Sequence, residues 1–386
     1  MAGRTAEPAL LCVVGFPSNT GFAWDFLEGL YARMAETLQA EGVRTFVAYP
    51  EIERPPDTLE ESVATAVELD ASLRSAGSLS ATAAFVREHG VRALFLIDQP
   101  SFNHRYAGIR RAGVERIVVY DHTSGARTPP RGLKRLVKRA AHAIPPWLAD
   151  EVLTVSDYVA RRQIDVALMP PGRVHTVHNG LAVPPRDPHA RERLRDVLGV
   201  DRERGVVGCA ARAAPEKGIE HLLRGFDLAC GRMEAPLPRL VFFGDGPDLE
   251  RLRGIAAGLE HADHVHLPGY RPGAADLLAG ADVCAVPSVW EDALPLAVLG
   301  AMARGCAVLA SRVGGVPEMI VDGESGLLVP PGDESALANG LVHLLANDTL
   351  RRSLGRAART RVEARFRPEE QVRRMCESVR PAFRTG

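Results

Sequence analysis

The sequence predicts an α/β protein with two doubly wound domains that face a cleft. Its 386 residues are long for one hydrophobic core and sufficient for two. Short apolar runs alternate with amphipathic patterns of helical length, which is typical of parallel sheets with helical crossovers. The alternation occurs as two separate series, and each is long enough to build a sheet of its own.

The first series occupies the amino-terminal half of the chain. Its short apolar runs lie between helical patterns, as expected of buried strands. We expect strands at 9–15, 43–49, 93–98, 116–122 and 152–156, with helices that include 22–40, 79–89 and 131–143. We interpret the run at 9–15 as a buried strand rather than a signal peptide, because Gly15-Phe16-Pro17 interrupts it early.

The second series follows a segment rich in proline and polar residues, LAVPPRD at 181–187, which indicates a domain boundary. It predicts strands at 205–211, 239–244, 264–269, 282–288, 307–312 and 326–331, and helices at 217–229, 248–258, 273–280, 295–304 and 334–346. We therefore expect an amino-terminal domain over 1–183 and a carboxyl-terminal domain over 184–360. A helical tail over 361–386 is expected to pack back on the amino-terminal domain.

Composition restricts the function classes. The chain is 46% hydrophobic and 25% charged with a net charge of −1, so its overall charge does not favour nucleic acid as a partner. No apolar stretch of about 18 residues predicts a membrane-spanning helix. The six cysteines form no C-x-x-C pair, which favours buried free thiols in a reducing cytoplasm over a metal site.

The loop after the run at 205–211 carries two cations. It reads ARAAPEKG over 211–218, and it places Arg212 and Lys217 between a strand's carboxyl end and a helix. Two positive side chains beside free helix N–H groups suit a diphosphate. Two solvated surface charges are the alternative, but only three of the 47 basic residues are lysine, and Lys217 is the only one in the second domain. We therefore favour a phosphate site.

Two further loops follow strands of the second series. Ligands of open α/β sheets bind beyond the carboxyl ends of the strands, so these loops are candidates by position. Gly244, in FGDGP, allows a tight turn where a flat ring could approach the backbone, and Tyr270 and Arg271 could frame a base. A plain strand-to-helix turn explains each loop nearly as well.

The segment WEDALPLAVLGAMARG, at 290–305, predicts a helix with Pro295 in its first turn and Gly305 as its C-cap. Asp292 stands just before this helix, and Gly300 lies one and a half turns inside it. The alternative is a buried amphipathic helix that Asp292 only caps. We expect phosphate or sugar oxygens to meet the backbone of Ala293, Leu294, Pro295 and Leu296.

The amino-terminal half offers fewer candidates. The loop Gly15-Phe16-Pro17-Ser18-Asn19-Thr20-Gly21 follows the first strand, and Gly21 is a candidate lining residue of the cleft. This loop does not match G-x-G-x-x-G, so it carries no dinucleotide fingerprint. His122 ends the strand at 116–122 and is expected to face the cleft, although a purely structural role fits its position equally well.

Together these segments resemble the family-4 glycosyltransferases, which have the two-domain architecture called GT-B. The resemblance is carried by ARAAPEKG (211–218), FFGDGP (242–247), VPSVWEDALPLAVLGAMARG (286–305) and SRVGGVPEMIVDGESGLLVPPGD (311–333). It implies retaining transfer of a sugar from a nucleotide-diphosphate sugar, which is a donor substrate rather than a cofactor, with no required metal. The first half matches mainly in its pattern and in His122, so it says little about the acceptor.

The resemblance also implies roles for single residues. Arg212 and Lys217 would hold the diphosphate, and His122 would lie near the donor sugar. Asp292 falls at the first acid of the family's E-x7-E pattern, which contacts the sugar. Gly300 falls at the second acid, which grips the ribose hydroxyls, and glycine removes that contact.

The missing acid leaves two function hypotheses. A hydrogen bond to a charged group is worth about 1.5–3 kcal/mol, so we expect a loss of about one to two decades of donor affinity. Because the ribose does not react, this favours a working hexosyltransferase-like enzyme with weakened nucleotide recognition. The second hypothesis is a non-catalytic sugar-nucleotide-binding protein of the same fold, which the Gly300 departure supports. The motif order disfavours a GT-B epimerase or phosphorylase.

One helix of the first half bears on the acceptor and on location. Arg131, Lys134, Arg135 and Lys138 follow i, i+3, i+4, i+7 spacing and share one helix face. Such a face beside Trp147 could rest on an anionic membrane or hold an anionic acceptor, which would be a small molecule, lipid or glycan. A solvated basic face is the alternative. We expect a cytoplasmic protein, at the inner face of the membrane if this helix binds lipid.

Overall fold

Two parallel sheets organise the computed structural model, which describes residues 7–19 and 22–384. Contacts within the chain divide it into two compact units. The first unit comprises 1–123, 127–178 and 369–386, and the second comprises 124–126 and 179–368. The chain therefore builds most of the first unit, then the second, and returns to the first with its last helix.

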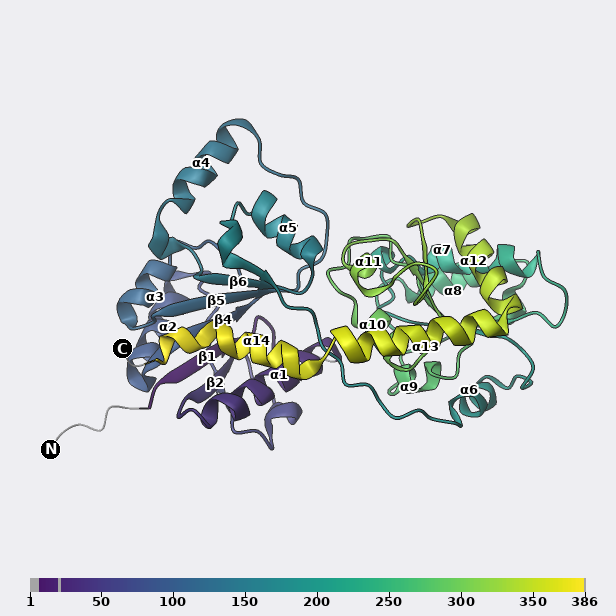
Figure 1. Cartoon of the computed structure of the whole chain (residues 1–386), viewed down its shortest axis with the longest axis horizontal. Helices are drawn as coiled ribbons and strands as arrows, with labels where there is room; N and C mark the ends of the chain where they lie inside the picture. Colours follow the sequence, from purple (N-terminus) through teal and green to yellow (C-terminus); the bar gives the residue numbers. More distant parts are fainter. Residues whose placement is uncertain (1–6, 20–21, 385–386) are drawn as a thin grey trace. The chain divides into compact units, whose positions relative to one another are not determined.

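The first sheet has seven strands in the order β3-β2-β1-β4-β5-β6-β7 (Figure 1). Its central strands are buried on both faces, which explains why they are continuous apolar runs rather than alternating ones. The strands are β1 (Ala9–Val13), β2 (Arg44–Tyr49), β3 (Thr65–Glu68), β4 (Val91–Ile97), β5 (Arg116–Asp121), β6 (Glu151–Thr154) and β7 (Val174–Thr176).

Helices cover both faces of this sheet. On one face, Val86 of α2 and Ile109 of α3 belong to one apolar cluster with Leu94 of β4. On the other, Gln371 of α14 donates a hydrogen bond to the Tyr120 hydroxyl of β5 at 2.9 Å. The helices of this unit are α1 (Phe22–Gln39), α2 (Ala76–His89), α3 (Tyr106–Ala112), α4 (Gly132–His142), α5 (Asp157–Asp165) and α14 (Pro368–Val379).

The second sheet has six strands in the order β10-β9-β8-β11-β12-β13. Neighbouring residues of β8 point to opposite faces, so Val207 joins a core cluster with α7 whereas Val206 joins one with α6. The strands are β8 (Val206–Ala210), β9 (Arg239–Phe243), β10 (Val265–Gly269), β11 (Val283–Val286), β12 (Val308–Ser311) and β13 (Leu327–Val329).

Eight helices accompany the second sheet among the described residues. They are α6 (Ala190–Leu198), α7 (Ile219–Cys230), α8 (Leu249–Ala257), α9 (Ala274–Leu278), α10 (Leu296–Ala303), α11 (Val316–Met319), α12 (Glu334–Ala346) and α13 (Asp348–Arg365). The helices α7, α8 and α12 contribute to the larger core cluster, and α6 and α9 contribute to the smaller one.

The predicted fold class of two doubly wound α/β domains is confirmed, and every expected strand is present. The short edge strands β3 and β7 lie outside the expected set, as do α3, α5 and α6.

The six cysteines are buried and free, as predicted. Of the predicted tail over 361–386, α14 belongs to the first unit, where Arg380 pairs with Glu41 at 2.7 Å. Within 7–19 and 22–384, no helix is both long and apolar enough to cross a bilayer.

A buried ion pair fixes α6 against the second sheet. Arg195 of α6 lies with its Nη2 atom 2.6 Å from Oδ2 of Asp282, and both side chains are fully buried. The same carboxylate oxygen accepts a hydrogen bond from the Val206 backbone N–H at 2.8 Å. Burial lowers the pKa of the Arg195 guanidinium, and the Asp282 charge opposes that shift. Asp282 also pairs with Arg191, and the Arg195 guanidinium donates to the Gly280 carbonyl at 3.1 Å. The buried carboxylate and guanidinium therefore belong to one polar network that would lose its anion without Asp282.

Asp282→Ala is expected to destabilise the second unit by about 3–5 kcal/mol, because it leaves the Arg195 charge buried without its partner. Urea unfolding followed by circular dichroism measures the change. The matched control is Glu250→Ala, which removes an exposed pair with Arg253 (2.6 Å) and should change stability by less than about 1 kcal/mol. An Asp282→Ala variant as stable as the control would show that this pair does not hold α6.

Candidate active site

Three loops of the second unit meet beyond the carboxyl ends of neighbouring strands. They follow β8, β11 and β12, which are adjacent in the sheet. The Val289 N–H, after β11, donates to the Glu216 carbonyl, after β8, at 3.0 Å. The Gly315 N–H, after β12, donates to the Asp292 carbonyl at 2.9 Å. These backbone hydrogen bonds hold the side chains of the three loops in a fixed arrangement.

Two glycines allow the loops to approach so closely. A Cβ atom at Gly218 would overlap the Pro287 carbonyl oxygen, and one at Gly314 would overlap the Asp292 carbonyl oxygen. Their φ angles of 65° and 51° also lie in the left-handed region that favours glycine. Both positions therefore exclude any side chain for packing reasons alone.

An ion pair lies at the centre of these loops. Lys217 Nζ is 2.8 Å from Asp292 Oδ1, and the Ser288 hydroxyl donates to Asp292 Oδ2 at 2.7 Å. The Asp292 side chain is 8% exposed, whereas that of Lys217 is 27% exposed. An ammonium group has three N–H donors, so Lys217 retains donors for a ligand while Asp292 fixes its direction. Separate motifs predicted these two residues, and the structure joins them.

Arg212 and Gly244 lie in loops that pack on each other. Arg212 follows β8 and is exposed. Gly244 follows β9, and a Cβ atom there would overlap the Ala211 carbonyl oxygen. The Asp248 N–H donates to the Ala213 carbonyl at 3.0 Å and ties the β9 loop to the β8 loop. Gly244 thus has a packing role, and the approach of a flat ring to it stays a prediction.

Helix α10 begins one residue later than expected. Pro295 is its N-cap rather than a residue of its first turn, and Leu296 is its first residue. Because proline has no N–H, Pro295 is not a backbone donor, and the Ala293 N–H already donates to the Ser124 hydroxyl at 3.2 Å. Leu294 and Leu296 therefore supply the N–H groups at the helix start, where they have no partner within the helix.

Gly300 lies within α10 and borders a guanidinium group. Among the described residues, and apart from its chain neighbours and the backbone of its own helix, Arg304 Nη1 is the only atom within 4 Å of a Cβ built at Gly300, at 3.5 Å. Arg304 folds back along the helix, donating to the Gly300 carbonyl at 3.2 Å and pairing with Asp276 of α9 at 2.6 Å. No close backbone approach accounts for glycine here, because a Cβ atom would make only an ordinary van der Waals contact with Arg304.

Two candidates of the second unit follow a strand that is adjacent to neither β8 nor β11. Tyr270 and Arg271 follow β10, an edge strand that β9 separates from β8, and both are exposed. Gly21 lies outside the described residues. Tyr270, Arg271 and Gly21 therefore remain predictions from the sequence.

A short segment from earlier in the chain belongs to the second unit. The Gly125 N–H donates to the Glu291 carbonyl at 2.7 Å, and a Cβ at Gly125 would lie 2.7 Å from Trp290 Nε1. Residues 124–126 thereby cover the start of the loop that carries Asp292. His122 precedes this segment by two residues and belongs to the first unit.

His122 stands at the carboxyl end of β5 beside the partly buried acid Asp98. Its backbone N–H donates to Asp98 Oδ1 at 2.7 Å, and its ring centroid is 4.2 Å from that of Tyr120. Asp98 follows β4 with a positive φ of 52°, an uncommon conformation for a non-glycine residue. Burial raises the pKa of the Asp98 carboxyl to about 7, so this group titrates near neutral pH.

A second acid holds the start of the loop after His122. Burial disfavours the charged form of Asp121, but the Arg162 guanidinium, 3.1 Å away, and hydrogen bonds from Thr123 and Gln163 lower its pKa below the usual value. The Thr123 N–H donates to Asp121 Oδ1 at 2.8 Å. Asp121 therefore remains ionised and orients the chain next to His122.

Sequence reasoning missed Ser288, Asp98 and Asp121. A signal was present for the two acids, because each ends an apolar run, ALFLID and RIVVYD, at a predicted strand end. No comparable signal marks Ser288, whose role depends on the position of Asp292 in the folded loop.

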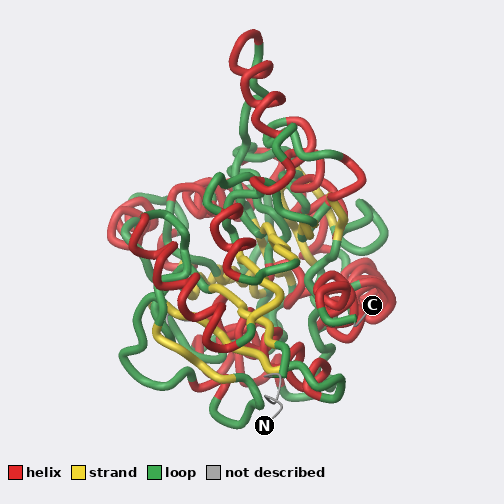
Figure 2. Tube along the Cα trace, turned by 90° about the vertical axis from the view of Figure 1, so that its left-hand side faces the viewer, coloured by secondary structure: helices red, strands yellow, loops and turns green. Residues whose placement is uncertain are grey.

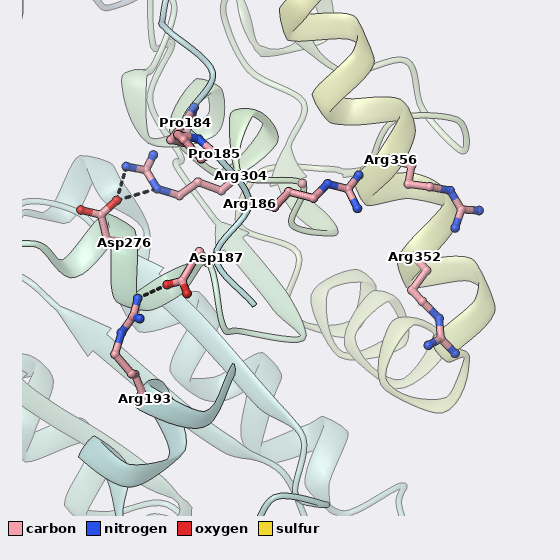
Figure 3. Close-up of a pocket in the computed structure, with 11 residues that line it drawn as sticks. Pro184, Pro185, Arg186, Asp187, Arg193, Asp276, Arg304, Arg352 and Arg356 are labelled. Atoms are coloured by element: carbon pink, nitrogen blue, oxygen red, sulfur yellow. Dashed lines mark hydrogen bonds and ion pairs between the residues drawn. The ribbon is translucent and has the colours of Figure 1, made fainter. Parts of the chain in front are cut away.

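A cavity of about 470 Å³ lies elsewhere in the second unit (Figure 3). Arginines line much of it, and two of them pair with acids, Arg304 with Asp276 and Arg193 with Asp187. Gly305, another lining residue, precedes β12, so the cavity adjoins the amino ends of the strands. None of the predicted site residues lines it.

In the described part of the chain, no group of three His, Cys, Asp or Glu could hold a metal ion.

Asp98→Asn is expected to change how stability depends on pH. In the folded protein the pKa of Asp98 is raised to about 7, whereas an unfolded aspartate titrates near about 4. The stability that the protonated group contributes is therefore complete below about pH 4 and lost as the pH rises through about 7. Asn cannot ionise and can still accept the His122 N–H.

We expect Asp98→Asn to unfold a few degrees above the wild type at about pH 8 and at nearly the same temperature at about pH 4. Thermal denaturation at both pH values measures this difference. An equal difference at both values would argue against a raised pKa.

Comparisons with known proteins identify the family. A family model described as Glycosyltransferase Family 4 matches residues 28–183, and one described as Glycosyl transferases group 1 matches residues 190–361. A glycosyltransferase structure from Rickettsia africae has a TM-score of 0.81 at 16% identity, covering 98% of this chain and 100% of that chain. A structure from Anabaena in complex with UDP has a TM-score of 0.76 at 19% identity, covering 96% and 99%. These likenesses show the fold, which is GT-B.

Curated relatives match part of the chain. A GDP-mannose-dependent alpha-(1-6)-phosphatidylinositol monomannoside mannosyltransferase from Mycolicibacterium smegmatis is 33% identical over 274 residues, which cover 65% of this chain and 66% of the relative. Across eight such relatives, the chain covers 16% to 68% of the relative's length. Because the two family models match its two halves in order, this chain belongs to glycosyltransferase family 4.

Proposed function

We propose that this protein is a retaining, metal-independent glycosyltransferase that moves a sugar from a nucleotide-diphosphate sugar to an acceptor hydroxyl. The observation that supports this most directly is the ion pair of Lys217 with Asp292 (2.8 Å) beside the start of α10. It provides a partly exposed cation of fixed direction at the carboxyl ends of the strands. Relatives of the chain are named as glycosyltransferases.

The donor diphosphate would bind to the loops after β8 and β11. Arg212 and Lys217 supply two cations, and the Leu294 and Leu296 amides supply donors where the helix dipole favours anions. The bond from the anomeric carbon to the phosphate oxygen breaks, and the nucleoside diphosphate leaves with the electron pair. The cations and amides stabilise the charge that develops on it, as a divalent metal would otherwise do. The acceptor oxygen forms its bond to the anomeric carbon on the face that the phosphate leaves, and the hydroxyl proton passes to the departing phosphate oxygen.

Asp292 and His122 are assigned to the donor sugar. Asp292 orients Lys217 in this structure, and its carboxylate has lone pairs left for a sugar hydroxyl. We assign His122 to a place near the transferred sugar, with its backbone held by Asp98. Gly244, Tyr270 and Arg271 remain the candidates to frame the base.

The alternative is a non-catalytic protein that binds sugar nucleotides. Gly300 favours it, because the implied ribose-binding acid is absent and the guanidinium of Arg304 borders its position. The ion pair of Lys217 and the amides at the start of α10 favour the enzyme, because they serve the leaving group rather than the ribose.

The class of acceptor has to be inferred from the amino-terminal half, where fewer residues match the family motifs. For the basic residues of α4 we propose an anionic partner, which is either a membrane whose cytoplasmic face the protein contacts or an anionic acceptor. The proposed acceptor is a small molecule, a lipid or a glycan, and no nucleic acid is involved. The basic residues are Lys134, Arg135 and Lys138 of α4 and its N-cap residue, Arg131.

Lys217→Ala is expected to slow sugar transfer by about 100-fold or more, because it removes a cation from the leaving phosphate. Activity is measured as nucleoside diphosphate released from UDP-, GDP-, ADP- and dTDP-sugars. The matched control is Arg224→Ala, which removes a cation of α7 that pairs with Glu220. Turnover of Lys217→Ala at the level of this control would refute the assignment.

A double variant separates folding from function in this experiment. Lys217→Ala alone leaves the buried Asp292 carboxylate without its cation, which lowers stability. Lys217→Ala/Asp292→Ala removes both charges, so we expect it to regain thermal stability but not activity. Recovery of transfer by the double variant would show that Lys217 acts only in folding.

Gly300→Glu is expected to bind the preferred nucleoside diphosphate about 10- to 100-fold more tightly, through restored hydrogen bonds to the ribose. Its kcat should change little, because the ribose does not react. Gly300→Ala is the control and should stabilise α10 by up to about 1 kcal/mol without changing affinity. Calorimetric titration with UDP, GDP, ADP and dTDP measures binding. No binding by the wild type or by Gly300→Glu would contradict the donor site.

A further inference from the structure

Helix α4 exposes its apolar side chains. Leu133, Leu136 and Val137 are 76%, 65% and 60% exposed, and no residue of the helix is buried. These three residues share one helix face, because they are spaced i, i+3 and i+4. An amphipathic helix of a globular protein normally turns such a face toward the core.

The polar side of α4 is the side that attaches it to the first unit. Lys138 Nζ donates to the Val166 carbonyl at 2.6 Å, and the His142 ring stacks on Phe102 with centroids 4.8 Å apart. At 100° per residue, Lys138 and His142 lie opposite the centre of the apolar face. The helix is therefore mounted with its apolar face outward, and it stands clear of the sheet (Figures 1 and 2).

The surroundings of α4 are strongly basic. Residues 123–149 contain six Arg and Lys and no Asp or Glu, whereas the whole chain has a net charge of −1, so the remainder carries −7 (−1 minus 6). Lys134 and Arg139 lie at the two borders of the apolar face by helical spacing, and both are exposed. The uncovered apolar face is thus framed by cations.

We infer that α4 docks this protein on an anionic phospholipid bilayer. Leu133, Leu136 and Val137 enter the boundary between headgroups and acyl chains, while Lys134 and Arg139 meet lipid phosphates. Docking on a bilayer selects the membrane among the anionic partners proposed above, so it rests on that proposal for the partner but not on sugar transfer. Of the four basic residues named there, Lys134 borders the apolar face, whereas Lys138 faces the first unit. A second copy fits less well, because a symmetric α4–α4 contact would bring the two sets of cations together.

Vesicle flotation tests this docking. Wild-type protein at low salt is expected to float with vesicles of phosphatidylcholine and phosphatidylglycerol, and to remain behind with phosphatidylcholine alone or at high salt. Leu133→Asp/Leu136→Asp should weaken flotation by about tenfold or more, because it places charge on the inserted face. Both side chains are exposed, so the fold should not change. Leu228→Asp, at an exposed leucine of α7, is the matched control and should float like the wild type.

Three results would overturn the inference. The first is wild-type protein that does not float at low salt, and the second is a Leu133→Asp/Leu136→Asp variant that floats as well as the wild type. The third is a wild-type dimer in light scattering that becomes a monomer in this variant. The first two exclude insertion of the apolar face, and the third assigns that face to a second copy. Thermal shifts with nucleoside diphosphates, measured on the same proteins, report the donor site separately. For the Leu133→Asp/Leu136→Asp variant we expect the thermal shifts to match those of the wild type while flotation is lost.

Discussion

The ion pair between Lys217 and Asp292 is the constraint on which the site of the second unit depends. A carboxylate as buried as Asp292 needs a compensating charge, and Lys217 supplies it only while the loops after β8 and β11 remain in contact. That contact requires glycine at 218, where a side chain would overlap the Pro287 carbonyl oxygen. The loop after β12 requires glycine at 314 for the same reason, because it approaches the Asp292 carbonyl oxygen. The glycines of the motifs thus allow the loop contacts that bring Lys217 to the buried Asp292 carboxylate. The same geometry leaves Lys217 partly exposed to a ligand.

Gly300 differs from these glycines, because nothing in the packing requires it. A Cβ there meets only the end of the flexible Arg304 side chain among the described residues outside the backbone of the helix, so close packing does not account for the glycine. The groups implied for the diphosphate are intact, and those implied for the ribose are not. Such a site would draw more of its donor affinity from the phosphates. The outward apolar face of α4 would contribute affinity for a membrane surface rather than for the donor.

Much of the fold could be read from the sequence, because strand and helix periods depend on neighbouring residues. Every expected strand is present. The short edge strands β3 and β7 were not predicted, because three or four residues carry too little hydrophobic pattern to be recognised as a strand. The basic face of α4 was visible as a spacing of charges. That its apolar side lies outward was not, because the same pattern fits a helix turned either way.

The sequence by itself determined the family motifs, the strand-end loops that carry them, and the candidate charges Arg212, Lys217 and Asp292. Only the tertiary structure decided which groups meet. Lys217 and Asp292 are 75 residues apart in the chain, and Asp98 reaches the His122 backbone across 24 residues. Such pairs depend on which strands become neighbours in the sheet. Burial also follows from tertiary packing, and it is burial that raises the pKa of Asp98 and makes the partner of Asp292 indispensable.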